Sequence, residues 1–140
     1  MYNVFNYKLK EDHLNIELIK TLRVLYVEDE IVLRDITSSS IESMIGRIVT
    51  ADNGQEGLDK FLCDKFDLII TDLSMPIMDG MTMIKQIREI NTEIPIIITT
   101  AFEIQSKELE SLNKIEKCIY IMKPVDIMKL LQSIDESFTL

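Results

Sequence analysis

The stretch that decides the fold reads Asp67-Leu68-Ile69-Ile70-Thr71-Asp72-Leu73-Ser74-Met75-Pro76-Ile77-Met78-Asp79-Gly80. Its apolar run is broken by a carboxylate, and a proline and a glycine follow. The run predicts a buried strand that ends at Asp72, and the proline and glycine predict a loop before the next helix. In α/β proteins, functional groups tend to lie in such loops at the carboxyl ends of strands. Asp72 is therefore the first candidate functional residue.

Further segments of the same apolar, β-branched character lie on both sides of this run. Together they give five predicted strands, at residues 23–27, 47–51, 68–71, 95–100 and 118–122. Segments with a helical apolar period alternate with them, at residues 31–44, 55–64, 80–90, 106–115 and 125–138. This alternation predicts an α/β fold, a doubly wound five-stranded parallel sheet with helices on both faces. We expect the flavodoxin-like strand order 2-1-3-4-5, in which the first and third strands are neighbours.

The helical period also predicts which side chains face the core. In the helix at residues 31–44 the inward candidates are Val32, Ile36 and Met44. The helix at residues 106–115 has a weaker apolar stripe, which suits an element of low local stability that can move.

Composition narrows the class of protein. The 140 residues suit one domain, and 46% hydrophobic with 28% charged residues is ordinary for a globular protein. No apolar stretch is as long as a membrane span and the start is no secretory signal, so a cytoplasmic location is expected. A net charge of -9 argues against a nucleic-acid surface but is compatible with a cation or a basic partner. Cys63 and Cys118 are predicted to be reduced, buried thiols.

Residues 1–21 form a predicted N-terminal extension, and residues 22–140 form the domain. A helix at residues 8–20, with Leu14, Leu18 and Leu22 on one face, and a disordered tail are both compatible with the extension. The single histidine, His13, lies there and is predicted to be a surface residue.

Polar residues gather at the predicted carboxyl ends of four strands. They are Glu28 and Asp29, then Asp72, Thr99 and Thr100, and finally Lys123. Two charges ~4 Å apart repel by ~4 kcal/mol at an effective dielectric of ~20, so three clustered carboxylates need a proton or a cation. Oxygen ligands on short acids suit Mg²⁺. Three acids, a hydroxyl and a lysine at one edge fit phosphoryl transfer to a carboxylate.

At this point the chain resembles the bacterial response-regulator receiver domains, over about residues 22–138. The resemblance rests on Val24-Leu25-Tyr26-Val27-Glu28-Asp29-Glu30, Asp72 through Gly80, Thr99-Thr100-Ala101 and Tyr120-Ile121-Met122-Lys123-Pro124. Each segment alone is modest, whereas their order and spacing together are highly specific.

The resemblance implies a phosphoryl and metal site. Asp72 matches the phospho-acceptor, which takes its phosphoryl group from a phosphohistidine on a sensor histidine kinase or a phosphotransfer protein. Asp29 matches the acid that binds Mg²⁺ directly, and Glu28 matches its neighbour, which usually acts through water. Ser74 matches the position whose backbone carbonyl completes the metal site.

The resemblance also implies a switch. Thr100 matches the switch hydroxyl, because the family places an alanine directly after it, and Tyr120 matches the switch aromatic. Lys123 matches the lysine that contacts the phosphoryl group, and Pro124 the residue after a cis peptide bond. The readout is expected on the surface of the fourth helix, fifth strand and fifth helix, toward an output domain or a homodimer partner. The domain is expected to be a signalling switch and not an enzyme with a separate substrate.

Two residues depart from the family pattern. Glu28 is longer than the aspartate common at its position, which makes its distance to the metal less certain. Phe102 is bulky at a position that flanks the phosphoryl group, so we expect it to restrict attacking water and to prolong the phosphorylated state.

Three other functions deserve comparison. An aspartyl phosphatase would place an acid two residues after the nucleophile, where this chain has Ser74. A flavin-binding module would bring a phosphate to the loop after the first strand, where Glu28 and Asp29 would repel it. A receiver-like module that mediates dimerisation or docking without phosphorylation stays open.

Overall fold

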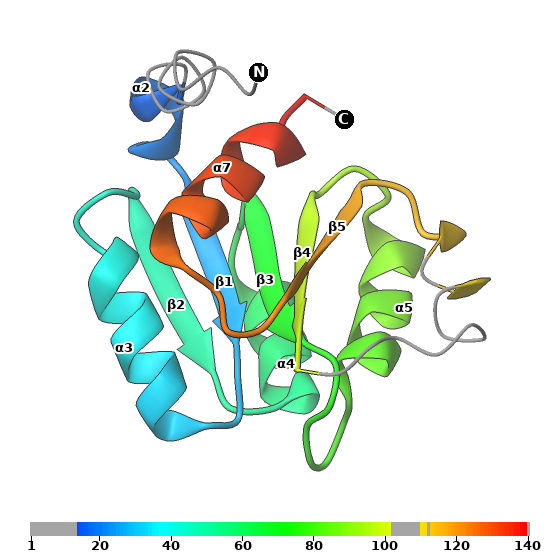
Figure 1. Ribbon diagram of the computed structural model, residues 1–140. Helices are drawn as coiled ribbons and strands as arrows, with labels where there is room; N and C mark the ends of the chain where they lie inside the picture. Colours follow the sequence, from blue (N-terminus) through cyan, green and yellow to red (C-terminus); the bar gives the residue numbers. More distant parts are fainter. Residues whose placement is uncertain (1–13, 102–109, 112, 140) are drawn as a thin grey trace, which may run out of the picture.

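The computed structural model describes residues 14–101, 110, 111 and 113–139. Five parallel strands form one sheet in the order β2-β1-β3-β4-β5, which confirms the predicted fold class and strand order (Figure 1). The strands are β1 Arg23–Val27, β2 Arg47–Ala51, β3 Leu68–Asp72, β4 Ile96–Thr100 and β5 Cys118–Met122.

Helices cover both faces of the sheet. The helices with described bounds are α2 Ile16–Ile19, α3 Ile31–Ile41, α4 Gly54–Cys63, α5 Gly80–Ile90 and α7 Ile127–Ser137. Helices α3 and α7 lie on one face, and α4 and α5 lie on the other (Figure 1). Most of the helix predicted at residues 106–115 lies outside the described residues, within which 110, 111 and 113 are helical.

Two apolar clusters fill the space between sheet and helices. Successive residues of the central strands alternate between them: Leu68 and Ile70 pack in the cluster under α7, whereas Ile69 packs in the cluster under α5. Every residue of β3 and β4 is buried. Near-continuous apolar runs of this kind are typical of parallel strands covered on both faces.

The predicted inward face of α3 is wrong. Val32 and Ile36 are 67% and 60% exposed, and Met44 is exposed and lies beyond the last residue of the helix. The side chains toward the core come instead from the row that begins at Leu33 and continues through Thr37 to Ile41. This row is polar at its middle, so the apolar period of the sequence favoured the neighbouring row.

A cavity lies beneath the inner row of α3. Its volume is about 380 Å³, and it is lined by Leu33 and Thr37 of α3, Tyr26 of β1 and Leu130 of α7, among others. Burial raises the pKa of the Tyr26 phenol, which is hydrogen-bonded to Thr37.

The two cysteines differ from each other. Both are free thiols, but Cys63 at the end of α4 is exposed, so its predicted burial is wrong, and Cys118 is half-buried. Cys63 lies five residues after the buried Leu58, and this spacing does not return to the buried face of the helix.

The described part of the N-terminal extension packs against α7. Leu14 and Leu18 contact the cluster that contains Ile134, and the Asn15 N–H donates to Asp135 Oδ1 at 3.1 Å. Asn15 also caps the short helix α2, because its side chain accepts from the Leu18 N–H. His13 and the earlier residues of the predicted helix lie outside the described residues.

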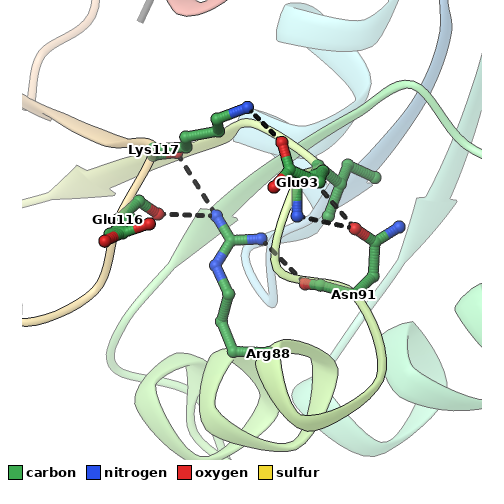
Figure 2. A network of polar contacts seen from close by, with 6 residues as sticks. Arg88, Asn91, Glu93, Glu116 and Lys117 are labelled. Atoms are coloured by element: carbon green, nitrogen blue, oxygen red, sulfur yellow. Dashed lines mark hydrogen bonds and ion pairs between the residues drawn. The ribbon is translucent and has the colours of Figure 1, made fainter.

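A polar network fixes the turn that leads into β5 (Figure 2). The Arg88 guanidinium at the end of α5 donates to the Asn91 carbonyl at 3.1 Å and to the Glu116 carbonyl at 2.9 Å. Lys117 in that turn forms an ion pair with Glu93 in the connection between α5 and β4. The turn before the edge strand β5 is thereby tied to α5.

Candidate functional site

Three carboxylates meet at the carboxyl edge of the sheet. Parallel pairing places Val27 of β1 opposite Thr71 of β3, so the residues that follow each of them, Glu28 and Asp72, become neighbours. Glu28, Asp29 and Asp72 each offer an oxygen, and these atoms all lie within 4.8 Å of one another. Glu28 is fully buried and Asp72 is 8% exposed, whereas Asp29 is accessible to solvent.

A lysine from the loop after the edge strand β5 joins this cluster. Lys123 follows β5, and its Nζ lies 2.6 Å from Glu28 Oε1 and 3.0 Å from Asp72 Oδ2. Its backbone N–H donates to the Thr100 carbonyl at 2.7 Å, which fixes the loop after β5 against the end of β4. The Lys123–Pro124 peptide bond is cis, as the resemblance implies.

The Asp72 carboxylate is held in one orientation. Its Oδ1 accepts from the Leu73 N–H at 2.7 Å, while its Oδ2 accepts from Lys123. The loop after β3 then returns closely to the strand end, and the Gly80 N–H donates to the Leu73 carbonyl at 2.8 Å. A Cβ at Gly80 would lie 2.0 Å from the Asp72 carbonyl oxygen, so this close approach requires glycine.

Burial and charge act in opposite directions on the Glu28–Lys123 pair. Burial raises the pKa of the Glu28 carboxyl to about 7, although the hydrogen bond and charge of Lys123 lower it. Burial alone would lower the pKa of Lys123, but its hydrogen bonds to Glu28 and Asp72 and the negative charges of these two acids together outweigh burial and raise it. Lys123 therefore stays charged at neutral pH, whereas Glu28 is close to its titration point.

The donor set suits a hard cation. Within the described part of the chain, Glu28 Oε2 and Arg88 Nε are the buried side-chain polar atoms without a hydrogen-bond partner. A buried carboxylate oxygen without a partner is unfavourable, and a cation would satisfy it. Three carboxylates face one ammonium group, so a divalent cation would also balance the remaining charge. Oxygen ligands of this kind fit Mg²⁺.

The other predicted site residues that the structure describes lie at the end of β4, in the loop after β3 and on β5. Thr100 is the last residue of β4 and is 8% exposed. Ser74 is exposed in the loop after β3. Tyr120 is 38% exposed, and its hydroxyl donates to Asn113 Oδ1 at 3.0 Å. Phe102 lies outside the described residues, so its expected effect on phosphate loss stays a prediction.

One supporting residue was missed by the sequence analysis. Arg34 Nη1 donates to the Glu28 carbonyl at 2.8 Å and so holds the chain where β1 leads into the acids. No pattern in the sequence indicates this contact, because the acceptor is a backbone carbonyl six residues earlier.

The fold and this edge define a doubly wound α/β domain with a buried acid–lysine cluster and a candidate cation site. The family model of the response regulator receiver domain matches residues 24–135. The chain belongs to this family, which confirms the resemblance seen in the sequence.

Relatives agree with this assignment. The chain is 33% identical over 115 residues to the transcriptional regulatory protein RprY of Bacteroides fragilis, covering 82% of this chain and 48% of that protein. It is 32% identical over 114 residues to the transcriptional regulatory protein ZraR of Klebsiella oxytoca, covering 81% of this chain and 26% of that protein. The chain thus spans a quarter to a half of these curated relatives.

A solved structure gives the same result. The crystal structure of a CheY-like response regulator receiver domain protein from Methanospirillum hungatei JF-1 superposes with a TM-score of 0.77 at 28% identity. The match covers 85% of this chain and 94% of that one.

In the part of the chain that the structure describes, no helix has the length and apolar character needed to cross a membrane.

Proposed function

We propose that this domain accepts a phosphoryl group on Asp72 from a sensor histidine kinase or a phosphotransfer protein, in a Mg²⁺-dependent reaction. The observation that carries the proposal is the Lys123 ammonium group, which bridges Asp72 and Glu28 within a cluster of three carboxylates. A lone acid at a strand end is often only a solvated terminus, but this acid is buried, oriented and paired.

In the proposed reaction an Asp72 carboxylate oxygen attacks the phosphorus of a phosphohistidine. A P–O bond forms, the P–N bond breaks, and the electron pair leaves on the donor's imidazole nitrogen, which takes a proton from water as it departs. The Leu73 N–H and Lys123 hold the carboxylate in place before attack. The ammonium group of Lys123, already 3.0 Å from Asp72 Oδ2, lies where it can stabilise negative charge on the phosphoryl oxygens.

We assign the cation to Asp29, Glu28 and Asp72, with the backbone carbonyl of Ser74 as a further ligand. The uncompensated Glu28 Oε2 supports this assignment. Mg²⁺, when bound, supplies positive charge that offsets the carboxylates and the phosphoryl oxygens. The expectation that Glu28 acts on the ion through water stays a prediction.

The proposed output of phosphorylation is a change at the β5 side of the domain. Thr100 would hydrogen-bond a phosphoryl oxygen, and Tyr120 would leave its exposed position as the surface around β5 and α7 switches. Tyr120 and Met122 are exposed on the edge strand β5, and Met128 is exposed on α7. This surface is suited to an output domain or a homodimer partner. A cytoplasmic location stays a prediction.

The test is incubation of the chain with Mg²⁺ and acetyl phosphate, followed by intact mass measurement. We expect one phosphoryl group on the parent chain, none on Asp72→Ala and little on Lys123→Ala. Omission of Mg²⁺ should abolish labelling. Equal labelling of parent and Asp72→Ala would contradict the proposal.

A receiver-like module that docks or dimerises without phosphorylation is the second candidate, favoured by the exposed apolar residues on the unpaired edge of β5. No labelling of the parent chain, together with a stable dimer that Met122→Asp dissociates, would favour this function.

A further inference from the structure

The cavity of about 380 Å³ lies between the sheet and the two helices that cover one of its faces, α3 and α7 (Figure 1). Its wall contains Leu33 of α3, Ile70 of β3, Val125 in the loop before α7 and Leu130 of α7. Protein interiors are normally packed so closely that few voids are larger than a water molecule. A space of this size inside the fold therefore needs an explanation.

The size and the wall of the cavity suit an apolar small molecule better than water. Most of the described residues in the wall are apolar, so several waters there would lack the roughly two to four polar partners that each needs. An apolar cavity of about 150 Å³ is large enough to bind benzene. By the same proportion, this cavity has room for about 15 non-hydrogen atoms.

The uncharged polar groups of the wall are hydroxyls. Tyr26 of β1 is 3% exposed, and its phenol is hydrogen-bonded to Thr37 on the inner row of α3. Thr99 of β4 is also buried and also lines the cavity. A hydroxyl group both donates and accepts, so these groups can pair with one hydroxyl or N–H group of an occupant.

The charged residue among the described residues of the wall, Lys123, favours a neutral occupant. Its Nζ lies 2.6 Å from Glu28 Oε1 and 3.0 Å from Asp72 Oδ2, so its charge is already paired. A buried anion would therefore gain little from Lys123 and would be repelled by the two acids. A buried cation would lose its hydration against an apolar wall whose own charge is the ammonium group.

We propose that this cavity is a binding site for a neutral, largely apolar small molecule of about 10–15 non-hydrogen atoms that carries one hydroxyl or N–H group. The apolar body packs between Leu33, Val125 and Leu130, and the polar group pairs with the hydroxyls of Tyr26 and Thr37. Lys123 belongs both to this wall and to the acidic cluster, so an occupant contacts a residue that orients Asp72.

The first test is an NMR titration of the isotope-labelled parent chain with 2-naphthol, a neutral bicyclic compound with one hydroxyl group. No Mg²⁺ and no phosphodonor are present, so the result does not depend on phosphorylation of Asp72. We expect saturable shifts of the backbone amides around the cavity, with the largest at Thr37, Thr99 and Val125. No saturable shifts at these amides would overturn the inference.

A second cavity serves as an internal control. It has a volume of about 370 Å³, but charged residues contribute to its wall, among them Arg88, Lys114 and Glu116. Because the two cavities are similar in volume and differ in lining, the amides around the second should not shift with 2-naphthol. Shifts concentrated there would contradict the inference.

The charge of the occupant is tested with naphthalene-2-carboxylate, which has the same rings and a negative charge at neutral pH. We expect it to bind about tenfold more weakly than 2-naphthol, or weaker still. Equal affinity of the two compounds would overturn the assignment of a neutral occupant.

Thr37→Leu places a larger side chain in the cavity and removes one hydroxyl, so 2-naphthol should bind about tenfold more weakly or less. Thr92→Leu is the matched control, because it makes the same change in the wall of the second cavity and should leave the affinity unchanged. Parent affinity in Thr37→Leu, or an equal loss in Thr92→Leu, would overturn the inference. Urea denaturation checks that both variants fold.

Val125→Phe narrows the cavity from the loop before α7 and decides the test if Thr37→Leu does not fold. We expect the same weakening of 2-naphthol binding by about tenfold or more. Binding to Val125→Phe at the parent affinity would show that the probe lies elsewhere.

Discussion

Glu28 has one methylene group more than an aspartate, and this length lets Oε1 reach Lys123 at 2.6 Å from the end of β1. Complete burial of the carboxylate raises its pKa to about 7, above the ordinary value of 4.5. The protonated form is therefore favoured in the folded protein relative to the unfolded chain. The stabilisation that this gives is fully present below pH 4.5 and is lost as the pH rises through about 7.

The same group predicts how metal affinity depends on pH. A carboxyl group must be ionised to bind a cation, so apparent Mg²⁺ affinity should rise as the pH passes through the Glu28 pKa. For one group with a pKa near 7, the increase between about pH 6 and pH 8 is roughly tenfold. Isothermal titration calorimetry at the two pH values measures it. A parent chain with the same pH dependence as Glu28→Gln would contradict the prediction.

At the scale of elements, the network around Arg88 joins α5 to the turn before β5 (Figure 2). The guanidinium donates to carbonyl groups on both sides of this junction. Burial lowers the pKa of Arg88, yet the group remains charged because arginine titrates far above neutral pH. Its side chain thus acts as a charged tie between backbone segments that do not pair with each other.

Arg88→Met should remove this tie and leave the carbonyl groups without their donor. Hydrogen bonds from charged donors contribute about 1.5–3 kcal/mol each, and water will replace part of the loss at this half-buried position, so a destabilisation of about 2–3 kcal/mol is expected. Urea denaturation measures it. Arg88→Lys, which keeps the charge but not the fork of donors, should recover only part of the loss. A variant as stable as the parent would show that the tie contributes little.

At the scale of the whole molecule, β4 lies between β3, which ends at Asp72 in the acidic cluster, and the exposed edge strand β5. Thr100 ends β4 beside Lys123, and β4 pairs with β5 so that Ile98 lies opposite Tyr120. A change at Thr100 therefore has a short route to the β5 side of the sheet.

Phosphorylation should change the surroundings of Tyr120. The ring is 38% exposed and bonded to Asn113, and we expect its exposure to decrease when Asp72 is phosphorylated. Fluorine NMR of fluorotyrosine-labelled protein, with the Tyr120 signal assigned from Tyr120→Phe, measures the change before and after acetyl phosphate is added. Thr100→Ala should be labelled but show a smaller shift. An unchanged Tyr120 signal in fully phosphorylated parent protein would contradict the switch.

Local patterns in the sequence determined the strands, their alternation with helices, and the polar residues at their carboxyl ends. Asp72, Glu28 and Lys123 could be placed at one edge because parallel strands bring their carboxyl ends together whatever the sequence distance. Tertiary contacts alone decided the rest. Packing places Thr37 on the inner row of α3. Hydrogen bonds from distant segments impose the left-handed backbone conformation of Ile77, with φ of 70°. Local preferences of tenths of a kcal/mol to about 1 kcal/mol cannot outweigh such contacts, so the sequence pattern did not indicate them.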